Sequence, residues 1–88
     1  MKIRQGFVLR EVSGRNVVVA MGKAAKDFHG MVMLNDTGKE IWNGVQQGLD
    51  EKAIAKNIAE NYMVDEKHAE EDVKKMIQKM MDHGFLEQ

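Results

Sequence analysis

The 88-residue chain contains no cysteine and no proline. Without cysteine it has no disulfide, no thiolate metal ligand and no thiol nucleophile. Without proline it has no proline-rich linker and no polyproline ligand. Its apolar runs are too short for a membrane span. The basic residues near the start, within residues 1–4, are not followed by an apolar stretch long enough for a secretion signal. These absences predict a cytoplasmic protein without membrane contact.

The residues that are present are typical of a globular domain. Hydrophobic residues make up 43% of the chain and charged residues 31%, and a chain of this length predicts a single domain over residues 1–88. The charge is uneven: residues 1–26 carry six Lys/Arg against Glu11 alone, and residues 27–88 carry seven Lys against thirteen Asp/Glu. This asymmetry predicts a basic face, able to meet an acidic peptide or enzyme surface, and an acidic face.

The first third of the chain has strand character. Residues 6–12 and 16–21 are rich in β-branched and aromatic side chains, and Ser13-Gly14 between them predicts a hairpin turn. Residues 22–30 read as a loop, and a third strand follows at 30–34. Because Met31 to Leu34 is apolar at every position, we expect this strand to be covered on both faces.

The pattern then becomes helical. Apolar spacing predicts helices at 36–47, 50–62 and 65–83, with Gly84 as a left-handed stop. Asn35 or Asp36 is placed to cap the first, Asp50 the second and Asp65 the third. Strands followed by helices predict an α+β fold: a winged-helix-like, three-stranded antiparallel sheet followed by a three-helix bundle.

Nothing in the sequence indicates an enzyme. None of the three histidines (His29, His68, His83) lies in a pattern that activates a nucleophile. His68 and Asp72 are four residues apart and share a helix face, but two residues without a third ligand do not make a metal site. We therefore expect no catalytic residue, no metal and no cofactor.

Winged-helix DNA binding is an alternative that electrostatics disfavours. A recognition helix presents its N-terminal residues to the bases beside the phosphates. Here that end, residues 65–72, carries five carboxylates against Lys67 alone. These charges repel a nucleic-acid backbone, so we expect no nucleic-acid partner.

Two segments, the strand that contains Met31 to Leu34 and the helix at 65–83, have more apolar residues than core packing requires, and this indicates a peptide-binding site instead. An apolar strand edge can accept an added strand, and the apolar arc of residues 65–83 spans about 140°, wider than the roughly 100° that packing one face requires. Methionines at 31, 33, 76 and 80 suit varied apolar partners. Packing within the core accounts for the same residues, and pairing of the strand with its own copy in a homodimer is a further alternative.

The segment from Gly30 to Gly38, followed by Ile41-Trp42, resembles the PqqD family, which comprises coenzyme PQQ synthesis protein D and its relatives, small peptide chaperones also called RiPP recognition elements. The cap at Asp50, the cap at Asp65 and the closing Gly84-Phe85-Leu86 fit the same family, and the resemblance covers residues 6–87. The chain departs from the PQQ-pathway members at Met33, where they usually carry a basic residue.

The resemblance implies a non-enzymatic domain that binds the leader segment of a ribosomally made precursor peptide and presents it to a modifying enzyme, often of the radical SAM type. It implies that the leader adds as a strand beside the third strand and packs against the third helix. Carried onto this chain, the implied peptide-binding residues are Met31, Val32, Met33, Leu34, Ala69, Val73, Met76, Ile77 and Met80.

Overall fold

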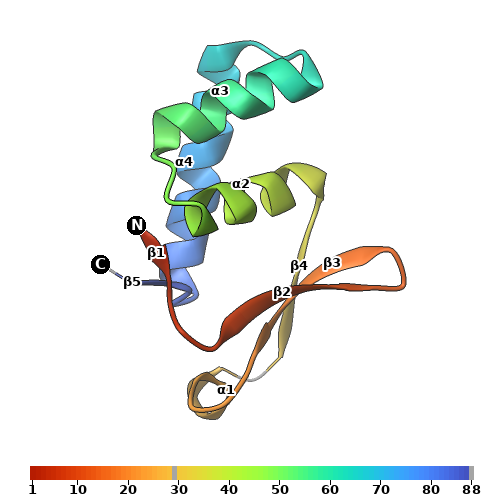
Figure 1. Ribbon diagram of the computed structural model, residues 1–88, viewed down its shortest axis with the longest axis vertical. Helices are drawn as coiled ribbons and strands as arrows, with labels where there is room; N and C mark the ends of the chain where they lie inside the picture. Colours follow the sequence, from red (N-terminus) through yellow and green to blue (C-terminus); the bar gives the residue numbers. More distant parts are fainter. Residues whose placement is uncertain (29, 88) are drawn as a thin grey trace.

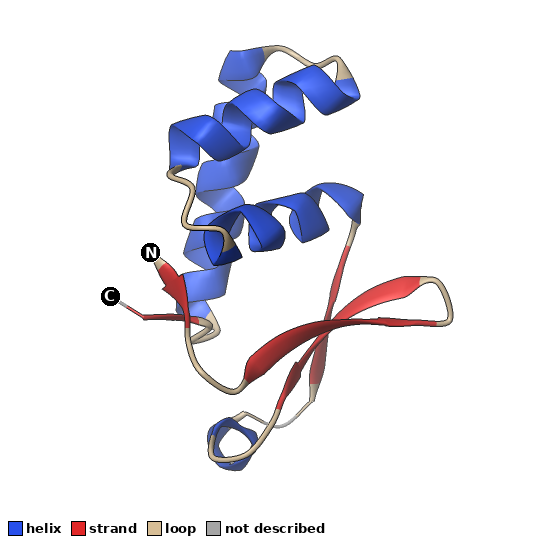
Figure 2. Ribbon diagram, viewed as in Figure 1, coloured by secondary structure: helices blue, strands red, loops and turns tan. Residues whose placement is uncertain are grey.

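The computed structural model describes residues 1–28 and 30–87. Its main sheet is antiparallel with strand order β2-β3-β4, formed by β2 (Phe7–Val12), β3 (Arg15–Ala20) and β4 (Met31–Leu34). Three helices follow in the chain: α2 (Asp36–Gln46), α3 (Glu51–Tyr62) and α4 (Glu66–Asp82). Figures 1 and 2 show these helices gathered together while the β2–β3 hairpin extends away from them. The predicted α+β class and three-stranded antiparallel sheet are confirmed.

The hairpin turn has the geometry that its sequence predicts. Ser13 and Gly14 both have positive φ, at 52° and 78°, as a two-residue turn requires when it must match the twist of its strands. Val12 then pairs with Arg15 across the turn. Because glycine tolerates this backbone conformation without strain, Gly14 fixes the register of the two strands.

Local side-chain contacts explain where α2 and α3 begin. The Asn35 side chain accepts a hydrogen bond from the Gly38 N–H at 2.8 Å, and the Asp50 side chain accepts one from the Ala53 N–H at 2.8 Å. Asn35, not Asp36, is therefore the cap of α2. The expectation for α4 was wrong in detail: Asp65 occupies the N-cap position but makes no side-chain capping hydrogen bond.

Three short elements differ from the sequence prediction. Part of the expected loop forms α1 (Ala24–Asp27), a single turn in which the Phe28 N–H donates to the Ala24 carbonyl at 3.0 Å. Strands β1 (Lys2–Ile3) and β5 (Leu86–Glu87) pair with each other in antiparallel register and bring the two ends of the described chain together (Figure 1). His29, within the same expected loop, lies outside the described residues.

The core lies between the helices and the inner face of the sheet. Trp42 of α2 and Phe85 after α4 are fully buried and meet edge to face with ring centroids 5.7 Å apart. Phe7 of β2 joins them, 4.9 Å from Phe85, and Val18 of β3 is completely buried. This aromatic centre holds the sheet against α2 and α4, and so fixes where β4 lies relative to the helices.

No helix within residues 1–28 and 30–87 has the length and apolar character needed to cross a lipid bilayer.

Candidate functional site

Strand β4 forms one edge of the three-stranded sheet. It pairs only with β3, from Asn16 opposite Leu34 to Val19 opposite Met31, and among the described residues no strand lies on its other side. A sheet edge of this kind presents backbone N–H and C=O groups to an incoming strand. The first requirement of strand addition is therefore met at β4.

The two faces of β4 have different surroundings. The side chains of Met31 and Met33 are 69% and 56% exposed, whereas Val32 is half-buried and Leu34 only 8% exposed. The prediction that both faces are covered was wrong, because successive side chains of a strand point to opposite faces and the core covers only one of them. The all-apolar pattern of β4 thus leaves two methionines on the outer face beside a free edge.

The outer face of the sheet continues from these methionines toward β2. Met33 lies opposite Val17, and Val17 lies opposite Arg10, so these three side chains share one face. Val17 is only 6% exposed although it is not part of the main core cluster. Its long neighbours on this face therefore cover it, and the outer face is an apolar strip with a guanidinium at its side.

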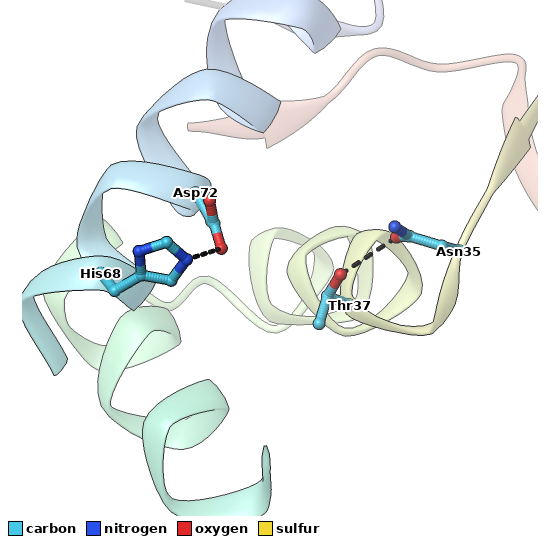
Figure 3. Close-up of polar contacts among 4 residues, drawn as sticks. All are labelled: Asn35, Thr37, His68 and Asp72. Carbon is cyan, nitrogen blue, oxygen red and sulfur yellow. Dashed lines mark hydrogen bonds and ion pairs between the residues drawn. The ribbon is translucent and has the colours of Figure 1, made fainter. Parts of the chain in front are cut away.

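A groove opens where β4 ends and α2 begins. Its volume is about 310 Å³. One wall is the first part of α2 with its cap, where the Thr37 hydroxyl donates to the Asn35 side-chain oxygen at 3.0 Å (Figure 3). The other wall is one flank of α4, formed by Asp72, Lys75, Met76 and Lys79. Since Asn35 directly follows β4 in the chain, the groove begins where the free edge of that strand ends.

The groove combines two apolar side chains, Ile41 and Met76, with several charges. Met76 is half-buried and also packs against the core, while Asp72, Lys75 and Lys79 are exposed. The Asp72 carboxylate lies 3.6 Å from Nε2 of His68, one turn earlier on α4 (Figure 3). This contact is an ion pair only when His68 is protonated. The described residues contain no cluster of three potential metal ligands.

The structure separates the predicted residues of α4 into two sets. Four side chains are core residues at 5% exposure or less: Ala69, Val73, Ile77 and Met80. Of the α4 residues predicted to bind peptide, only Met76 lines the groove. One flank of α4 therefore packs on the core, and the flank that includes Met76 borders the groove.

Asp72, Lys75 and Lys79 were not among the predicted binding residues. The sequence analysis followed apolar side chains, and these three are polar. A signal was present nonetheless, because Asp72, Lys75 and Lys79 follow one another at spacings of three and four residues and so share one side of the helix.

The two histidines that the structure describes both have aromatic or acidic neighbours. The ring of His83 stacks on Phe85, with centroids 5.2 Å apart and planes at 19°, and so serves packing. His68 has Asp72 as its partner on the solvent-exposed surface.

Comparisons with known proteins agree with this fold. The family model for "Coenzyme PQQ synthesis protein D (PqqD)" matches residues 7–86. A solved structure described as "TbiB1 in Complex with the TbiA(beta) Leader Peptide" has a TM-score of 0.80 at 22% identity, covering 99% of this chain and 95% of that one. A second, "Lasso peptide synthetase B1 complexed with the leader peptide", has a TM-score of 0.78 at 18% identity, covering 94% and 92%. No curated protein matches the chain significantly.

Proposed function

The chain belongs to the PqqD family, and from that premise we propose that it is a non-catalytic peptide-binding domain. It takes up the leader segment of a ribosomally made precursor peptide and presents it to a modifying enzyme, of the radical SAM type or another, in the cytoplasm where the precursor is made. The two structural neighbours were both solved with leader peptides, which supports the same class of ligand here.

The observation that carries the proposal is the free edge of β4 beside the groove of α2 and α4. An extended peptide gains main-chain hydrogen bonds from the edge, and its alternating side chains then face opposite ways. Those on the inner side meet Val32 and the groove with Met76. Those on the outer side lie next to Met31 and Met33. Strand addition thus uses both faces of β4, including the exposed methionines that the core does not need.

The winged-helix alternative has less support from the surface of α4. The five carboxylates of residues 65–72 belong to residues that are exposed or half-buried, so a duplex at that end meets negative charge. Self-association through β4 is consistent with the open strand edge, but it leaves the groove between α2 and α4 without a ligand. We therefore propose neither nucleic acid nor a second copy as the ligand.

The test is peptide binding, with Met33→Asp as the diagnostic variant and, as the ligand, the leader of any precursor peptide whose gene adjoins the gene for this protein. Met33 is exposed, so the change leaves the core intact, but it places a carboxylate next to the added strand. We expect the affinity to fall by at least about 1–2 kcal/mol, measured by titration calorimetry. Val12→Asp is a matched control, because Val12 is 53% exposed and lies on the same sheet face, on the strand farthest from β4.

Equal affinity of Met33→Asp and the unmodified chain would contradict the site. Equal losses in Met33→Asp and Val12→Asp would also contradict it, since a general charge effect would then explain the result.

A further inference from the structure

Two exposed lysines line one wall of the groove. Lys75 and Lys79 are one turn apart on α4, on either side of Met76 in the sequence, and both are exposed. Neither lies within 4 Å of a carboxylate oxygen on any side chain that the structure describes. Lys79 lies in the last turn of α4, where a cation is favourable, and Glu71 stands one turn before Lys75. Because neither lysine is engaged in an ion pair with a described side chain, both ammonium groups are available to a ligand in the groove.

The groove contains one carboxylate to set against these two ammonium groups. Asp72 lines the same wall, and His68 lies 3.6 Å from its oxygen. Arg10 and Arg15 share the outer face of the sheet with Met31 and Met33, but they lie on β2 and at the start of β3, away from the free edge of β4. A strand added at the edge of β4 and reaching the groove therefore has its cationic neighbours on the helix side, at Lys75 and Lys79.

We infer, on the basis of the proposed function, that the bound leader carries an acidic residue among its apolar positions and that Lys75 and Lys79 select it. Met76, between the two lysines, contacts a neighbouring apolar side chain of the same peptide. The groove then binds peptides in which an acidic residue stands beside apolar ones. A basic residue at the acidic position is repelled by the two lysines and weakens binding. Exposed ion pairs are weak, so the expected selection is roughly three- to tenfold between acidic and basic peptides.

The experiment uses the full chain and a random peptide library, so it does not depend on knowing the natural precursor. Twelve-residue peptides displayed on phage are selected on the immobilised protein, and the recovered sequences are compared with the unselected library. We expect enrichment of Asp or Glu at one position beside apolar residues. The affinity of a recovered acidic peptide should fall as salt rises, because exposed charges are screened.

Charge variants show which lysines are responsible. The double variant Lys75→Glu and Lys79→Glu should recover peptides with Lys or Arg at that position. The double variant Lys75→Gln and Lys79→Gln should show no charge preference, and it avoids placing new carboxylates near Glu71. The matched control is Lys52→Glu with Lys56→Glu on α3, another exposed lysine pair four residues apart, which does not line the groove and should leave the acidic preference unchanged.

The outcomes separate this inference from the proposed function. Recovered peptides that are lost by Met33→Asp but show no acidic preference would overturn the inference and leave peptide binding at β4 intact. An acidic preference that persists when Lys75 and Lys79 are both Gln, or that disappears in the α3 control, would also overturn it. If no peptide binds, or if binding ignores Met33→Asp, the proposed function fails and the inference with it.

Discussion

Two apolar residues of α4, one turn apart, should respond to truncation in opposite ways. Val73 has 0% exposure and belongs to the core, whereas Met76 is half-buried and lines the groove. Val73→Ala removes two buried methyl groups. At about 1 kcal/mol each, including the cavity that they leave, the free energy of unfolding should fall by about 2 kcal/mol. For a domain of this size, this corresponds to a melting temperature lower by about 8–16 °C.

Met76→Ala should lower the melting temperature less, because part of its side chain is already in water, and about 1 kcal/mol is expected. Its main effect should be on peptide binding, with affinity reduced about three- to tenfold through the lost apolar contact. Val73→Ala, measured at a temperature where it is fully folded, should bind within about twofold of the unmodified chain.

The assay is a thermal melt followed by circular dichroism, paired with titration of a peptide recovered by the display selection. The reasoning fails if Val73→Ala melts normally and binds weakly, or if Met76→Ala is the less stable variant with normal binding. Either result would mean that the opposite flank of α4 borders the ligand. Val73→Asp is unsuitable as a binding test, since an unpaired carboxylate at a fully buried position should unfold the domain.

Two further predictions concern the helices around the core. Alanine favours helices over glycine, but Gly44→Ala should still destabilise the domain by about 1–2 kcal/mol, because a Cβ at this position would lie 2.7 Å from Cγ1 of Ile54 on α3. A thermal melt measures this, and an unchanged or higher melting temperature would show that α3 is not this close. The pKa of Tyr62 is raised above its ordinary value of 10.0, first by partial desolvation and then by the nearby carboxylates of Glu40 and Asp36. Glu40→Gln should therefore lower this pKa. A titration of phenolate absorbance measures it directly, because the chain has one tyrosine. The pKa of Tyr62 is higher in the folded state, so the unfolded chain loses this proton first, and the free energy of unfolding should fall as pH rises through 10.0 toward the raised pKa. A tyrosine titration that Glu40→Gln leaves unchanged would contradict the role given to the Glu40 carboxylate.

The elements that follow from local sequence signals could be predicted, and those that depend on tertiary contacts could not. Ser13-Gly14 and Asn35 set the hairpin turn and the start of α2 through their own backbone geometry and hydrogen bonding. By contrast, β1 and β5 are two residues each, too short for any period. They form because the two segments meet in the folded protein, and no local sequence pattern predicts that contact.

The same distinction applies to the candidate site. The apolar residues Met31 and Met33 are visible in the sequence, but which side chains of β4 face outward depends on which face of the sheet the helices cover. On α4 the apolar arc marks the core, and the groove depends on how α4 is rotated against α2. Lys75 and Lys79 acquire significance only once that rotation is known.

The length of β4 explains why the edge and the groove must act together. Its four residues offer about four outward main-chain hydrogen bonds, because the outward N–H and C=O groups come from alternate residues. At a net value of about 1 kcal/mol each they contribute about 4 kcal/mol, against an association cost of about 4–15 kcal/mol. The edge alone therefore does not hold a strand, and a second copy of β4 that brought only its own edge would bind weakly. A peptide that also places apolar and acidic side chains against Met76 and its neighbouring lysines gains the missing free energy, so the groove decides which strands the open edge accepts.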